Sequence, residues 1–253
     1  SFPTRRSSDL KILNSKEFGK TIEERKKLLY EGGLDIYTTM DVNANSAAMK
    51  AARAAIPADD ASKMEVMMAA IKPGTGEVLG FGINKIYDTS PEANNDPART
   101  AMNFAVDQID GGGSGFPVGS TWKPINLVAW MRKGHSINEV LPAPGVVNLY
   151  RDIPGFRGVN TWDVKNSGGT PGYAESPLDG LVNSHNTTQA AMAKVIGLEP
   201  IAQAAEDIGF HQASKQKMNM HLKDDTANGG AYQAPLIIGG TVSAAPQIGR
   251  AHV

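Results

Sequence analysis

The chain has 253 residues, with 25 lysines and arginines against 26 aspartates and glutamates, and it contains no cysteine. The near-zero net charge gives no basis for binding to nucleic acid or to an anionic membrane, because both need clustered positive charge. The lack of cysteine excludes disulfides, zinc–thiolate sites and thiol catalysis, and no apolar run is long enough to suggest a membrane-spanning helix.

Both ends of the chain differ in character from the rest. Residues 1–10 and 248–253 each resemble a translated sequencing adapter, so we expect artefact tails with no role in the fold. If so, the natural protein continues in both directions. Residues 11–60 are predicted to be a linker with N-terminal helices that lead into one main domain over residues 61–247.

The first third of the main sequence predicts helices and one hairpin. Residues 17–30 are typical of a short surface helix, and residues 34–39 have the β-branched and aromatic bias of a strand. Asp41 is a suitable N-cap for a helix that Pro57 ends. Residues 64–71 and 77–83 are predicted strands, joined by the turn residues 72–76 into a hairpin.

Loops and helices follow the hairpin. Residues 87–100 are predicted to be a loop. The glycine-rich residues 110–119 are predicted to be a second loop, packed closely against a neighbouring group. Residues 120–133 predict a helix, and Pro124 fits its first turn because the N–H groups there have no intrahelical acceptor. Residues 142–180 read as a long irregular stretch that lines a site. Two alanine-rich helices are predicted over 187–196 and 199–208. This order indicates an α+β fold, with helices around a small antiparallel sheet that looks incomplete.

Ser120 and Lys123 form the first candidate catalytic pair. A serine at a helix start and a lysine three residues later share one helix face, where the lysine can accept the hydroxyl proton if burial keeps part of it neutral. The spacing alone is weak evidence, because Ser8–Lys11 and Ser214–Lys217 repeat it. Ser120 differs because a glycine-rich loop leads to it and an apolar helix follows it.

Ser184 and Asn186 form the second candidate group. A hydroxyl and an amide two residues apart, just before a helix, can share a proton network and orient a substrate amide. The alternative is a plain helix cap, and Ser136 with Asn138 illustrates that reading. The two candidate groups together, each at the head of an apolar helix, favour the catalytic reading.

At these residues the chain resembles the penicillin-binding transpeptidases, especially the bifunctional class that also carries a glycosyltransferase domain. The serine–lysine and serine–asparagine motifs are two of the three that these enzymes share with β-lactamases. His185 stands where class A β-lactamases have aspartate, which favours the transpeptidase branch. The resemblance rests on four stretches, Leu28–Asp41, Ala70–Leu79, Phe116–Pro124 and Asn183–Thr188.

The resemblance implies a serine acyltransferase that cross-links peptidoglycan stem peptides and is acylated by β-lactams, with no metal or organic cofactor. Ser120 would be the nucleophile and Lys123 its base. Ser184 would pass a proton to the leaving D-alanine, and Asn186 would bind the substrate amide and position Lys123. The resemblance also implies a place at the extracytoplasmic face of the bacterial membrane, with a membrane anchor upstream. Oligomeric state does not follow from it.

The third family motif, a K-T-G or K-S-G triplet, does not occur in the sequence. The expected fold is therefore an incomplete β-lactamase/transpeptidase-like fold whose C-terminal strands lie downstream of residue 253. In the family that motif's strand supplies one of two oxyanion-hole N–H groups. Loss of one such donor typically lowers the rate by about 10²–10³, so we expect the chain on its own to be nearly inactive.

Several further residues have weaker assignments. Trp162, Tyr173 and Thr188 are candidate substrate-binding residues, the first two because they lie in the long irregular stretch. Three histidines have no metal-ligand spacing and are read as surface or loop residues: His135, His211 and His221.

Two alternatives stay open. The first is a hydrolase on the same scaffold, a D,D-carboxypeptidase or a serine β-lactamase, in which water replaces the acceptor amine. The second is a non-catalytic penicillin-recognising module. Lys123 beside Ser120 favours an enzyme, because simple binding has no use for a base at that position.

Overall fold

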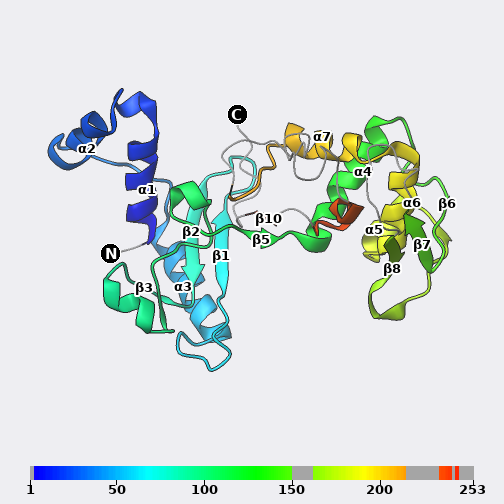
Figure 1. Ribbon diagram of the computed structural model, residues 1–253, viewed down its shortest axis with the longest axis horizontal. Helices are drawn as coiled ribbons and strands as arrows, with labels where there is room; N and C mark the ends of the chain where they lie inside the picture. Colours follow the sequence, from blue (N-terminus) through cyan, green and yellow to red (C-terminus); the bar gives the residue numbers. More distant parts are fainter. Residues whose placement is uncertain (1–2, 150–161, 215–233, 241–242, 245–253) are drawn as a thin grey trace. The chain divides into compact units, whose positions relative to one another are not determined.

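A computed structural model describes residues 3–149, 162–214, 234–240 and 243–244 (Figure 1). The chain divides into two compact units. The first unit comprises residues 1–115, 212–216 and 244–253, and the second comprises residues 116–211 and 217–243. Helices and short strands occur in both, so the predicted α+β class is confirmed. The predicted domain limits of 61 and 247 remain a prediction.

The first unit begins with helices. They are α1 (Pro3–Asn14), the 3₁₀ turn η1 (Lys16–Phe18), α2 (Ile22–Glu31) and α3 (Val42–Ala55). The predicted helix over residues 17–30 is wrong at its start, because Thr21 and Glu24 form a reciprocal capping box that begins α2 at Ile22. Asp41 caps α3 as predicted, accepting from the Ala44 N–H at 2.7 Å.

The predicted hairpin is confirmed. Strands β1 (Met67–Ile71) and β2 (Val78–Ile83) pair antiparallel, with a bulge at Ala70 and Ile71. Helix α3 packs on β2, where Gly80 and Gly82 let the backbones approach closely. Phe81 of β2 packs with Ala105 and Val106 in a small buried core.

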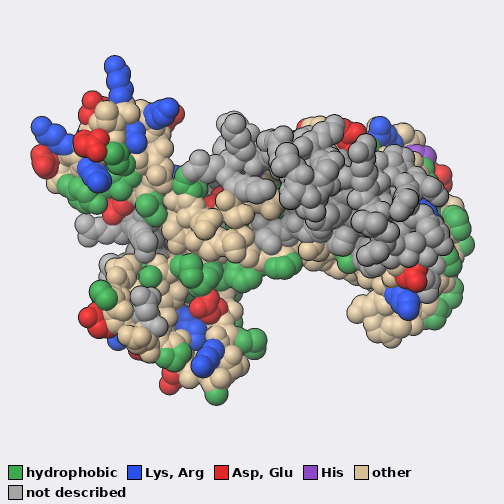
Figure 2. Space-filling view, viewed as in Figure 1, with side chains coloured by type: hydrophobic (Ala, Val, Ile, Leu, Met, Phe, Trp, Pro, Cys, Tyr) green, Lys and Arg blue, Asp and Glu red, His purple; other side chains and the backbone are tan. Residues whose placement is uncertain are grey.

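Two predictions in the first unit need correction. Residues 34–39 form no strand, because they make no backbone ladder within the described residues; Ile36 and Tyr37 are exposed. The predicted loop over residues 87–100 contains a short parallel pair, β3 (Ile86–Tyr87) and β4 (Arg99–Thr100). The 3₁₀ turns η2 (Pro91–Asn95) and η3 (Gln108–Asp110) complete this region. On the face shown in Figure 2, charges of both signs are interspersed around α1 and α2.

The helices of the second unit agree with most predictions. They are η4 (Gly119–Trp122), α4 (Lys123–Arg132), α5 (Pro177–Val182), α6 (Asn186–Ile196), α7 (Glu199–Asp207) and η8 (Ala234–Ile238). The predictions over 120–133, 187–196 and 199–208 are confirmed. Helix α5 was missed, although Ser176 as N-cap, proline at the next position and Asp179 in the first turn are helix-start signals.

Four short strands lie in or at the edge of residues 142–180, which were predicted to be irregular: β6 (Leu141–Pro142), β7 (Val146–Leu149), β8 (Trp162–Lys165) and β9 (Ala174–Glu175). β6 pairs with β9, and β7 with β8, both antiparallel, so the described strands form separate pairs and not one sheet. The remaining short elements of the second unit are β5 (Phe116–Pro117) and the turn η5 (Ser167–Gly169), and β10 (Ser243–Ala244) lies where the sequence passes from one unit to the other.

The core of the second unit fixes α4 against its neighbours. Trp122 and Trp130 are buried, and the Trp122 ring meets Phe210 edge-on with centroids 5.1 Å apart. The amide of Asn126 donates to Gln189 Oε1 at 2.9 Å and to the Ile237 carbonyl at 2.7 Å. These two bonds tie α4 to α6 and η8, and so hold the starts of α4 and α6 in a fixed relation.

Candidate active site

Ser120 lies in a turn that a left-handed glycine makes possible. Gly119 has a φ of 54°, a conformation that favours glycine, and its N–H donates to the Gly239 carbonyl at 3.3 Å. The chain then enters η4 and α4, so Ser120 stands at the helix start as predicted. Its side chain is exposed, and its hydroxyl makes no hydrogen bond to another described residue. The hydroxyl is therefore free to meet a ligand.

Lys123 is the first residue of α4, one turn after Ser120, and its side chain is 1% exposed. Its Nζ donates to the Ser184 carbonyl at 2.6 Å, to Ser184 Oγ at 3.0 Å and to Asn186 Oδ1 at 2.7 Å. Burial lowers the pKa of Lys123 to about 8, because the charged amine is removed from water. A lysine with this pKa has an appreciable neutral fraction at pH 7 and can act as a base.

Ser184 adopts a backbone conformation that serine rarely takes, with a φ of 55°. Its N–H donates to the Leu181 carbonyl at 3.0 Å, and the next N–H, of His185, donates to the Gly180 carbonyl at 2.8 Å. These bonds hold the turn between α5 and α6. Both the hydroxyl and the carbonyl of Ser184 then reach Lys123. A strained residue held by its surroundings at a polar centre is typical of a functional site.

Asn186 begins α6 and has a fixed amide orientation. Its Nδ2 donates to the Lys165 carbonyl at 2.9 Å, so its Oδ1 is the atom that faces Lys123. The structure thus joins three of the four predicted catalytic residues directly. Ser120 is the fourth; it lines a cavity together with Ser184 and Asn186, and its hydroxyl makes no hydrogen bond with Lys123.

An open cavity of about 380 Å³ lies over these residues, entirely within the second unit. Its lining comes from the turn before α4, the segment after β8, the α5–α6 turn and the end of η8. The lining is mostly hydroxyls and amides, which suits a peptide-like ligand with several carbonyl and N–H groups. The lining residues are Gly119, Ser120, Asn166, Ser167, Thr170, Asn183, Ser184, His185, Asn186 and Ile238.

The three predicted substrate-binding residues are placed differently. The backbone of Trp162 starts β8, and its side chain lies outside the described residues. Tyr173 is 60% exposed and does not line the cavity. Thr188 is fully buried on α6, where its hydroxyl donates to Glu175. Their role in binding remains a prediction.

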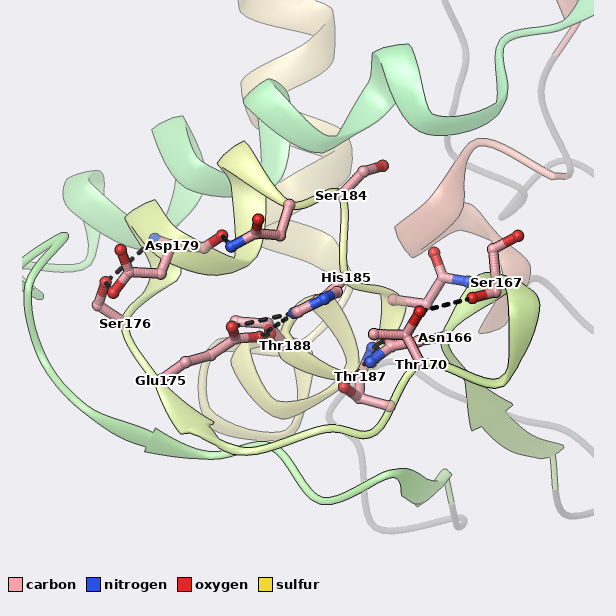
Figure 3. A network of polar contacts seen from close by, with 12 residues as sticks. Asn166, Ser167, Thr170, Glu175, Ser176, Asp179, Ser184, His185, Thr187 and Thr188 are labelled. Carbon is pink, nitrogen blue, oxygen red and sulfur yellow. Dashed lines mark hydrogen bonds and ion pairs between the residues drawn. The ribbon is translucent and has the colours of Figure 1, made fainter.

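Sequence reasoning missed a polar network beside the cavity. Glu175 accepts from the Thr188 hydroxyl, and both of its carboxylate oxygens lie within 3.0 Å of His185 Nδ1. Figure 3 shows the α5–α6 turn between two groups, with Glu175 and Ser176 on one side and Asn166, Ser167 and Thr170 on the other. No sequence motif pointed to Glu175. His185 was read only as the middle residue of a motif.

The remaining histidines have ordinary surroundings where they are described. His135 pairs with Glu139 and stacks on Trp130, and His211 Nδ1 lies 3.1 Å from the Gly209 carbonyl. His221 lies outside the described residues. Within the described ranges, no three His, Asp or Glu side chains form a group that could hold a metal ion. Among the same residues, no helix combines the length and apolar character needed to cross a membrane.

Comparisons with known proteins indicate the family and the fold of the chain. The family "Penicillin binding protein transpeptidase domain" matches residues 66–247. No curated protein sequence matches the chain. Similar solved structures include penicillin-binding protein A from M. tuberculosis as an imipenem acyl-enzyme complex, with a TM-score of 0.62 and 21% identity, over 96% of this chain and 57% of that one.

A second similar structure is the penicillin-binding protein PonA1 from Mycobacterium tuberculosis, with a TM-score of 0.65 and 20% identity, over 94% of this chain and 53% of that one. A third is the penicillin G acyl-enzyme complex of penicillin-binding protein A, with a TM-score of 0.62, 21% identity, and coverage of 97% and 57%. At such identities the likeness shows the fold alone. The chain spans little more than half the length of these proteins.

Proposed function

This chain belongs to the penicillin-binding protein transpeptidase family, and from that membership we propose that it carries the acyl-enzyme chemistry of a peptidoglycan D,D-transpeptidase. One observation carries the proposal: the buried amine of Lys123, with its lowered pKa, is held by Ser184 and Asn186 at the cavity that Ser120 lines. A nucleophile, a base and a proton-relaying hydroxyl are the parts that acyl transfer needs.

The proposed acylation starts with the neutral form of Lys123. Its lone pair accepts the Ser120 proton while Ser120 Oγ attacks the carbonyl of the penultimate D-alanine in a stem peptide. The carbonyl–nitrogen bond then breaks, and the terminal D-alanine leaves with a proton passed from Lys123 through the Ser184 hydroxyl. An ester to Ser120 remains. The positive end of α4 stabilises the oxyanion that forms between these steps.

The second half of the reaction transfers the acyl group. An amine of a neighbouring stem peptide attacks the Ser120 ester. Its proton passes by way of Lys123 to Ser120 Oγ as the ester bond breaks, so the cross-link forms and both the hydroxyl and the neutral amine are restored. Asn186 Oδ1 accepts from Lys123 and, through its second lone pair, from an N–H of the substrate amide, and so orients both. We propose that β-lactams acylate the same hydroxyl, since two of the similar structures are named as β-lactam acyl-enzyme complexes. The extracytoplasmic face of the bacterial membrane is the proposed location, because the proposed substrate lies there.

The hydrolase alternative differs only in the second step, where water replaces the amine. Chromatography of the products of a stem-peptide reaction, with and without an added amine, separates the two. The alternative of a binding module predicts peptide binding without any covalent adduct. Lys123 favours an enzyme over a binding module, because a buried amine with a lowered pKa, one helical turn from Ser120, is suited to proton transfer.

The direct test is labelling with a fluorescent penicillin, compared between the unaltered chain and Ser120→Ala. Because no K-T-G or K-S-G triplet is present, we expect slow labelling of this chain and robust labelling of a longer protein that contains the triplet. Strong Ser120-dependent labelling of the 253-residue chain would contradict the expectation that this chain is labelled slowly. No labelling even in the longer protein contradicts the function.

A further inference from the structure

Two neighbouring residues at the end of β8 hold two neighbouring residues at the start of α6. Asn186 Nδ2 donates to the Lys165 carbonyl at 2.9 Å. The N–H and the hydroxyl of Thr187 both donate to Asn166 Oδ1, at 3.1 and 3.3 Å. Three hydrogen bonds therefore join residues 165–166 to residues 186–187. One of these residues, Asn186, is itself bonded to Lys123.

The orientation of the Asn166 amide follows from chemistry. The Thr187 N–H can only donate, so the Asn166 atom that faces it must be the oxygen. The other branch, Nδ2, is buried and has no hydrogen-bond partner in the described part of the chain. Asn166 as a whole is 6% exposed and lines the cavity.

An unpaired buried amide lowers stability, so each such group in a folded protein calls for an explanation. Asn166 retains this group while its oxygen serves the first turn of α6. That turn carries Asn186, whose amide has to stay in one orientation for Oδ1 to face Lys123. Because the burial of Nδ2 is unfavourable, the presence of Asn166 is better explained by a role in the site than by a contribution to stability.

We propose that Asn166 is a positioning residue of the acylation centre. It fixes the first turn of α6 against the end of β8, so that Asn186 keeps its Nδ2 on the Lys165 carbonyl and its Oδ1 on Lys123. This inference rests on the proposed function, because it assigns Asn166 a role in orienting the proposed base. Within the described residues, Asn166 makes no hydrogen bond with Ser120 or Lys123.

The test compares Asn166→Ala with Asn166→Asp in the 253-residue chain by nuclear magnetic resonance. Alanine removes the acceptor, whereas aspartate keeps an acceptor of the same shape at the start of a helix. The reporter is the side-chain NH₂ pair of Asn186, assigned by its loss in Asn186→Asp. Ser167→Ala is the matched control, since Ser167 is the next cavity-lining residue and bonds to neither Asn186 nor Thr187.

We expect the Asn186 NH₂ signals to lose their distinct shifts in Asn166→Ala and to keep them in Asn166→Asp and Ser167→Ala. In Asn166→Ala the Lys123 titration should also move up from about 8 as water enters. This titration is not compared for Asn166→Asp, because an added carboxylate raises the Lys123 pKa by its charge. Unchanged Asn186 signals in Asn166→Ala overturn the proposal.

A second variant covers the case in which Asn166→Ala does not fold. Thr187→Val removes only the hydroxyl bond and should shift the Asn186 signals partly; no shift overturns the proposal. In the longer, penicillin-labelled protein, Asn166→Ala should acylate about 10- to 100-fold more slowly, the usual effect of a misplaced catalytic group. Failure of the unaltered protein to label contradicts the proposed function, whereas the Asn186 signals judge the role of Asn166 separately.

Discussion

Lys123 Nζ lies 2.7 Å from Asn186 Oδ1, although 63 positions separate the two residues in the sequence. The contact joins the start of α4 to the start of α6, and the same amine also reaches the hydroxyl and carbonyl of Ser184. All three of its N–H positions are thereby used. To take a proton from Ser120, the amine has to be neutral. It then gives up one of these three hydrogen bonds, and its lone pair has to point toward Ser120 Oγ.

Lys123→Arg tests whether the residue acts as a base. Arginine keeps the positive charge but does not lose its proton at accessible pH, so acylation by penicillin should fall by about 10²–10⁴, the usual contribution of a general base. The measurement is the rate of covalent labelling in the longer protein, with circular dichroism as the control for folding. A rate within twofold of the unaltered protein contradicts the assignment.

The pH dependence of acylation should follow the neutral form of Lys123. Burial lowers its pKa to about 8, so the neutral fraction rises about tenfold per pH unit below that value and levels off above it. The rate should therefore rise from pH 6 to 8 and then become constant. Ser120→Ala measures the background reaction of the reagent. A flat profile between pH 6 and 9 contradicts the role of Lys123.

The left-handed backbone of Ser184 predicts different stabilities for two variants. Ser184→Gly and Ser184→Ala both remove the hydroxyl, so both should acylate slowly, but only glycine adopts a φ of 55° without strain. We expect the glycine variant to be more stable by about 1 kcal/mol, measured by urea denaturation. Equal or reversed stabilities would show that another conformation is present in solution.

Gly180 in α5 lies so close to α6 that a side chain has no room. A Cβ at Gly180 would meet Thr188 side-chain atoms at 2.5–2.6 Å, whereas one at Gly145 would meet nothing nearer than 3.5 Å. Gly180→Ala should therefore lower the free energy of unfolding by about 1–3 kcal/mol. Gly145→Ala is the control and should change it by much less. Thermal unfolding of both variants decides the matter.

The sequence predicted the elements whose signals are local. The cap at Asp41, the hairpin turn and the helices after Ser120 and Asn186 need only neighbouring residues for their definition, and these were correct. Residues 34–39 show the limit of this reasoning, because a strand forms only where a partner strand lies beside it. Helix α5 had readable start signals at Ser176, but the surrounding glycines and prolines outweighed them.

The candidate site shows the same division. Lys123, Ser184 and Asn186 could be named from their spacing together with their places at the heads of two apolar helices, and the structure brings them into contact. Asn166 could not be named, because its role depends on the end of β8 lying against the start of α6, which no local pattern encodes. Glu175 could not be named for a similar reason, since its partners are His185, in the turn before α6, and Thr188 on α6.

The partners of the Lys123 amine are two carbonyl oxygens and a hydroxyl, and none of them carries a formal charge. Its lowered pKa comes from burial, without a contribution from a neighbouring ion. Dissolved ions screen interactions between charges far more than they alter the cost of burying one. The proton affinity of this amine should thus be nearly the same in dilute buffer and in concentrated sodium chloride, which sets it apart from bases that depend on a carboxylate.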